Sequence, residues 1–155
     1  MLLCAILNAN SMQLSDKLAA SPPIAPKANW HDDIASDEAD KVREVGRRFL
    51  ESAAANDHMA GFTLLSEDTK AYFGSAENYY KKMAKEAPLL YTHTERALDS
   101  VLLVRGKVVL LAAIRQNVGE CAIAFLIFEP ASLADNAPWA LVDLWLEEAA
   151  CGVAV

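Results

Sequence analysis

Residues 107–128, KVVLLAAIRQNVGECAIAFLIF, hold two apolar runs around a short polar stretch, and these runs decide the fold. In the first run, Val109, Leu111 and Ala113 alternate with residues that are just as apolar, and CAIAFLIF is apolar throughout. Alternate residues of a β-strand point to opposite faces, so both faces of these two strands are apolar. A sheet of this kind should be covered on both sides.

Further strands flank this pair. Arg105, Gly106 and Lys107 predict one tight turn and NVG at 117–119 a second, whereas PASLADNAP at 130–138 is a longer, proline-bounded loop. Consecutive strands on short turns indicate a curved antiparallel meander. The strands are predicted at residues 91–104, 107–116, 120–129 and 138–148.

Helical periodicity precedes the strands. From Asp37 to Ala53, apolar residues form one stripe with charged residues opposite, and Ser36 is the predicted N-cap. A short second helix is predicted through Met59, Phe62 and Leu65.

The segment SEDTKAYFG at 66–74 is interpreted as a connection to a third helix, which begins after the cap Ser75 and is ended by Pro88. Helices followed by an antiparallel sheet predict the α+β class, with the helices on one sheet face. The other face should be covered by the N-terminal segment or by a second copy of the chain, and we predict a homodimer through the sheet.

Composition and charge narrow the function. The chain has 155 residues, 54% of them hydrophobic, which suits one domain with its own core. The net charge of −7 would repel the phosphates of nucleic acid, so no nucleic-acid partner is expected. We predict an N-terminal segment with a Pro-rich linker at 1–36, a domain at 37–150 and a tail at 151–155.

The cysteines give no sign of a metal centre. Cys4, Cys121 and Cys151 form no CxxC pair and have no histidine at zinc spacing. Three cysteines cannot all be paired in disulfides within one chain. Cys121, in an apolar run, is interpreted as a small buried hydrophobic residue. The sequence also lacks a phosphate-binding glycine loop and a Ser-His-Asp signature, so we predict no metal and no cofactor.

The N-terminus allows two interpretations. MLLCAILNANS contains an apolar run but no basic residue before it, so residues 1–20 are either a signal-like segment or the first turns of an accessory helix. The prolines of SPPIAPKANWHDD at 21–33 predict an extended linker. We expect a periplasmic or secreted protein in the first case and a cytoplasmic one in the second, with no stable membrane span.

The order of these segments resembles the nuclear transport factor 2-like superfamily of cone-shaped α+β domains, and within it an uncharacterised bacterial group, domain of unknown function 4864. The resemblance rests on FLESAAANDHMAGFTLLSEDTKAYFGSAENYYKKM, APLLYTHTERAL and PWALVDLWL, and covers roughly residues 37–155. It implies a cone formed by helices and a curved sheet. Members range from isomerases and dehydratases to noncatalytic binding subunits, and those of the bacterial group often look exported.

Candidate site residues follow from the chemistry that such a cone could hold. An isomerase needs a carboxylate base and hydrogen-bond donors. The candidate acids are Asp99 and Asp143, and the candidate donors or bases are Tyr72, Tyr80, Tyr91 and His93.

Each candidate also has a simpler interpretation. Asp143 suits a solvent-facing acid or a partner of Arg115, and His93 a solvated strand start. Trp139 and Trp145, on one predicted strand face with Leu141 and Asp143, suit an interface or ligand pocket. We therefore predict a noncatalytic dimeric binding or accessory module whose cone holds a small apolar ligand. The alternative is a cofactor-independent isomerase or dehydratase-like enzyme using a cavity Asp or His.

Overall fold

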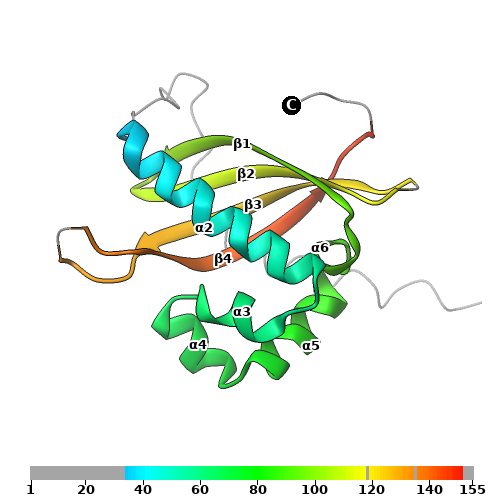
Figure 1. The fold of residues 1–155 in the computed structure, drawn as a ribbon, viewed down its shortest axis with the longest axis horizontal. Helices are drawn as coiled ribbons and strands as arrows, with labels where there is room; N and C mark the ends of the chain where they lie inside the picture. The colour runs from blue at the N-terminus through cyan, green and yellow to red at the C-terminus, as the bar shows by residue number, and fades with distance from the viewer. Residues whose placement is uncertain (1–33, 118, 135, 152–155) are drawn as a thin grey trace, which may run out of the picture.

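The fold is α+β, with helices packed on one face of an antiparallel sheet (Figure 1). It comes from a computed structural model that describes residues 34–117, 119–134 and 136–151, so the predictions for residues 1–20 and 21–33 lie outside the described residues. Within those ranges there are five helices and four strands: α2 (Ser36–Ala54), α3 (His58–Thr63), α4 (Glu67–Phe73), α5 (Ala76–Glu86), α6 (Leu89–Thr92), β1 (Glu95–Val104), β2 (Lys107–Arg115), β3 (Cys121–Pro130) and β4 (Trp139–Glu148).

The sheet is the predicted meander. Its strands follow in the order β1-β2-β3-β4, each antiparallel to the next. Arg105 and Gly106, which form the β1–β2 turn, both have positive φ values, 52° and 76°, as a two-residue hairpin turn requires. The last three predicted strands agree with the structure to within one residue at each end.

Helix α2 provides most of the cover for the sheet. It buries Val42, Phe49 and Leu50 completely or almost so. A Cβ atom at Gly46 would lie 2.2 Å from Cδ2 of Leu110 on β2, so glycine allows the helix to approach the strand closely. The N-cap is Ala35, which makes no side-chain cap hydrogen bond, so the predicted cap at Ser36 was wrong by one residue.

Helix α4 replaces a predicted connection. The Ser66 side chain accepts a hydrogen bond from the Thr69 N–H group at the start of this helix, and Gly74 ends it in the left-handed conformation with φ 75°. The next helix, α5, begins after the predicted cap Ser75, whose side chain accepts from the Asn78 N–H group. The structure therefore has two helices, α4 and α5, where the sequence predicted a connection and one helix.

The first strand begins later than predicted. Residues 89–92 form helix α6, and β1 starts only at Glu95. Pro88 is the N-cap of α6 with φ −59°, a value suited to the beginning of a helix, and the helix buries Leu89 and Leu90. Tyr91 is consequently helical, and His93 follows the helix instead of lying in a strand.

The interpretation of Cys121 as a small buried hydrophobic residue was wrong, because it is half-buried and disulfide-bonded. Cys121, at the start of β3, forms a disulfide with Cys151, across 30 residues of sequence. Pairing of β3 with β4 brings the two ends together, because Ala149 donates a backbone hydrogen bond of 2.9 Å to the Cys121 carbonyl. The disulfide therefore ties the end of the described chain to the sheet.

Candidate functional site

A bulge in β4 divides the strand into two parts. Phe128 of β3 pairs with Leu141, but the preceding residue, Ile127, pairs with Asp143, which leaves Val142 as an extra residue. An extra residue reverses the alternation of faces beyond it. Trp145 therefore does not share a face with Leu141, and the prediction of one common face for residues 139, 141, 143 and 145 was wrong.

Before the bulge, β4 faces the helices. Trp139 packs against the hydrophobic core, and its Nε1–H group donates a hydrogen bond of 2.7 Å to Oε2 of Glu38 on α2. Hydrogen bonds from Lys41 and then Trp139 lower the pKa of Glu38. Trp139 thus joins the first turn of α2 to the sheet.

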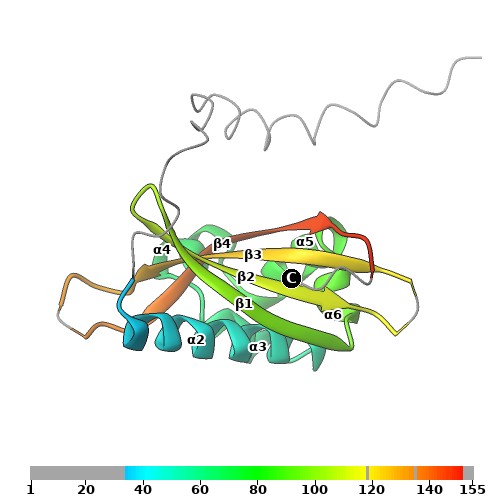
Figure 2. The same ribbon diagram turned by 90° about the horizontal axis from the view of Figure 1, so that it is seen from above.

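After the bulge, β4 contributes to the opposite face of the sheet, which we call the open face. Figure 2 shows α2 and α3 on the other side of the sheet. The rings of Phe125 and Trp145 stack on the open face with centroids 4.8 Å apart and planes 6° from parallel. The strand registers place further apolar residues around this stack: Leu102, Val109, Leu111, Ala113, Ile123 and Ile127.

Ion pairs stand at the two ends of this apolar area. Lys107 of β2 pairs with Glu129 of β3, and at the other end Arg115 pairs with Glu95. The predicted partner of Asp143 is therefore engaged elsewhere. An apolar centre with a charged margin is the usual layout of a protein interface.

Asp143 is exposed, and its carboxylate accepts a hydrogen bond from the main chain of its own strand. Oδ1 accepts a hydrogen bond of 2.8 Å from the N–H group of Leu144. The other candidate acid, Asp99, accepts a hydrogen bond of 3.2 Å from the Ser100 hydroxyl. Neither carboxylate is enclosed by the helices and the sheet.

His93 is buried, contrary to its interpretation as a solvated histidine. Its side chain is 3% exposed, and Nδ1 lies 2.8 Å from the Leu90 carbonyl oxygen, to which it donates in the neutral tautomer that this contact favours. Burial lowers the pKa of His93, which favours the neutral ring. Within the described part of the chain its Nε2 atom has no hydrogen-bond partner.

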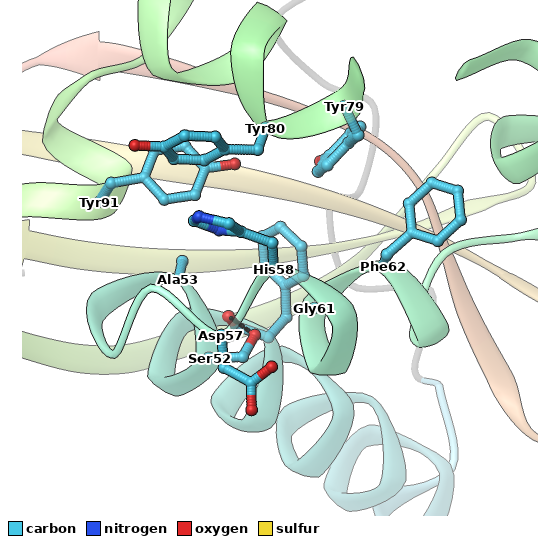
Figure 3. Close-up of a pocket in the computed structure, with 10 residues that line it drawn as sticks. Ser52, Ala53, Asp57, His58, Gly61, Phe62, Tyr79, Tyr80 and Tyr91 are labelled. Carbon is cyan, nitrogen blue, oxygen red and sulfur yellow. Dashed lines mark hydrogen bonds between the residues drawn. The ribbon is translucent and has the colours of Figure 1, made fainter. Parts of the chain in front are cut away.

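A small aromatic cavity lies between α2, α3, α5 and α6 (Figure 3). The imidazole of His58 stacks on Tyr80 with centroids 3.7 Å apart, and Tyr80 meets Tyr91 edge to face at 5.0 Å. Burial raises the pKa of Tyr91 to about 12. The cavity volume of about 10 Å³ has room for about one water molecule.

An outer groove brings together three of the predicted residues. Tyr72, which is 76% exposed, lies with Asp143 and Trp145 along a groove of about 670 Å³ between α4, α5 and β4. Tyr80 and Tyr91 line the interior cavity instead, so the predicted residues separate into an inner and an outer set. Two residues outside the predicted site also line these spaces: His58 lines the cavity, and Tyr79, which the helical stripe of α5 predicts as core or cavity lining, lines both.

Tyr79 links the two sets, and its phenol stays protonated at ordinary pH. Burial, and to a smaller extent Tyr91 and Asp143, raise the pKa of its phenol. Among the residues placed by the structure, no three His, Cys, Asp or Glu side chains are grouped to hold a metal ion. No helix in the same residues is long and apolar enough to cross a membrane.

Comparisons with models of protein families, with curated proteins and with solved structures find no match to this chain. The resemblance to the nuclear transport factor 2-like superfamily therefore stays a prediction from sequence.

Proposed function

We propose that this protein is a noncatalytic binding module that forms a homodimer through the open face of its sheet. The observation that carries the proposal is the stacked pair of Phe125 and Trp145 on an apolar face with charged margins. Large exposed apolar areas on a domain favour association. In a two-fold homodimer the same surface patch of each copy covers that of the other.

The interior supports a role without chemistry. The helix-facing side of the sheet packs into a continuous core, and the adjoining aromatic cavity has a volume of only about 10 Å³. A drug-sized ligand needs several hundred Å³, so a small apolar ligand inside the domain would require the aromatic side chains to move. Binding at the outer surfaces is therefore the function that we favour.

The nuclear transport factor 2-like cone belongs to the same proposal. A long helix lying across a curved four-stranded meander is consistent with that superfamily, whose members include noncatalytic binding subunits. Fold alone carries little information on activity, so the proposal depends on the surface and not on the likeness.

Sedimentation equilibrium on the full chain tests the dimer. We expect the mass of two chains at micromolar concentration, and the mass of one chain for Phe125→Lys, because the lysine would place a charge at the centre of the interface. Leu133→Lys is the matched control, since Leu133 is a fully exposed apolar residue in the β3–β4 loop. It should sediment like the wild type.

Two results would contradict the dimer. One is a wild-type chain that stays monomeric at the highest soluble concentration. The other is a Phe125→Lys chain that unfolds cooperatively, and so is folded, yet keeps the wild-type mass.

A further inference from the structure

One side of β4 is only partly paired. The strand lies at the edge of the sheet, and its outer side is met at Leu141 by the segment between α3 and α4. Ser66 donates to the Leu141 carbonyl at 2.8 Å, and Leu141 donates to the Leu64 carbonyl at 2.9 Å. Beyond the bulge, no segment in residues 34–117, 119–134 or 136–151 continues this pairing.

The free part of the edge presents main-chain groups in a defined order. Ala149 donates its N–H group to the Cys121 carbonyl of β3. Alternate residues of an antiparallel strand direct their N–H and C=O groups to opposite sides, so Leu146 and Glu148 direct theirs outward. The N–H group of Leu144 also points outward, and the Asp143 carboxylate occupies it.

The groove described above runs beside this edge. Its walls include apolar side chains from both layers, such as Phe73, Met83 and Leu146. Its charged side chains are Asp68, Glu86, Asp143 and Lys82. The groove is therefore apolar with an excess of negative charge.

Lys82 offsets only one of these three negative charges. Its ammonium group lies over the rings of Tyr72 and Phe73, 5.6 and 5.4 Å from their centroids. A cation in this position is held by the aromatic faces. The three carboxylates remain available to an incoming cation.

We propose that this groove binds an extended, basic segment of a partner protein, which adds to the sheet as a strand beside β4. The outward groups of Leu146 and Glu148 supply the main-chain hydrogen bonds. Alternate side chains of the added strand enter the apolar groove, and its lysines and arginines meet Asp68 and Glu86. This goes beyond dimerisation, because the dimer uses the open face of the sheet and the added strand uses its edge.

The choice of a basic partner follows from charge. The groove carries three acids against one lysine, and the whole chain has a net charge of −7. Two copies of the same acidic edge would repel each other across such a pairing. A basic strand is attracted from a distance and held at the edge.

A labelled peptide tests the proposal on the full chain. The probe is a fluorescent seven-residue peptide that alternates valine with arginine or lysine, compared with a version that has proline at the centre. We expect the first to bind and to slow the amide hydrogen exchange of Leu146 and Glu148. The proline version should bind more weakly, because it lacks the central N–H group and disfavours the strand conformation.

Charge reversal on the helices provides the second test. Asp68 and Glu86 are both exposed, so Asp68→Lys/Glu86→Lys should fold normally and bind the peptide roughly tenfold more weakly. Asp40→Lys, on the exposed side of α2 and outside the groove, is the control and should bind like the wild type.

Several outcomes would overturn the proposal. These are the absence of peptide binding at millimolar concentration, equal binding of the proline version, or binding that leaves the exchange of Leu146 and Glu148 unchanged. Slow exchange at these amides before peptide is added would also overturn it. If that protection grows with protein concentration, a second copy occupies the edge; if it does not, another segment of this chain does. The double variant Asp68→Lys/Glu86→Lys leaves the open face unchanged, so its loss of peptide binding does not depend on whether that face forms a dimer.

Discussion

The two faces of β3 differ in their surroundings far more than in their composition. Ala122, Ala124, Leu126 and Phe128 face the helices and are at most 4% exposed. Ile123, Phe125 and Ile127, which alternate with them, are only half-buried on the open face. A sequence that is apolar on both faces predicts that both need cover. It does not say whether that cover lies within the folded chain or comes from another one.

A matched pair of substitutions would separate these two faces. Phe128→Ala should lower the free energy of unfolding by about 3–5 kcal/mol, because Phe128 is completely buried and leaves a cavity. Phe125→Ala should cost less than about 2 kcal/mol, because its ring is already partly in water. Urea denaturation at a concentration where both proteins are monomeric measures the difference. Equal losses would show that the open face is covered within the monomer.

The disulfide gives a second comparison, between the cross-linked end of the described chain and the rest of the sheet. It closes a loop with a sequence separation of 30, for which chain entropy predicts about 3–4 kcal/mol of stabilisation. Reduction, or Cys121→Ser/Cys151→Ser, should lower the stability by this amount and should speed amide exchange first near Ala149. Identical urea midpoints with and without reductant would contradict this prediction.

These contrasts show why some parts of the fold could be predicted from the sequence and others could not. The alternation in residues 107–128 and the turn at Arg105 and Gly106 were sufficient for the meander, because strand period and turn chemistry are local properties. Helix α4 could also have been found from its Ser66 cap and its terminal Gly74. The sequence contained that signal, and the helix was missed.

Other features depend on contacts that are distant in sequence. The bulge at Val142 contains no glycine or proline, and it arises from the register of β4 against β3. The same register brings Cys151 to Cys121. Because the bulge moved Asp143 and Trp145 to the open face, the candidate site could be named by residue but not assembled from the sequence.

The free energy of unfolding should depend on pH through the buried side chain of His93. Burial lowers the pKa of His93 in the folded state below its ordinary value of 6.5, so the unfolded chain binds this proton more readily. The contribution to stability is fully present above pH 6.5 and decreases as the pH falls through the folded-state pKa.

The check is the urea midpoint measured between pH 7.5 and pH 5 for wild type and His93→Leu. We expect the decrease with falling pH to be smaller in the variant, whatever its absolute stability. Parallel curves would mean that His93 does not cause the loss.

The smallest expected effect concerns the question whether Asp143 acts as a reactive acid or as part of its strand. In Asp143→Ala the Leu144 N–H group loses its acceptor and turns to water, so stability should fall by about 0.5–1 kcal/mol. Asp143→Asn keeps an oxygen at the same place and should be close to the wild type. Amide exchange at Leu144 measures the difference directly, faster in the alanine variant and nearly unchanged in the asparagine one. If both variants exchange alike, the carboxylate does not protect the strand edge, and its exposed position beside Trp145 would need another explanation.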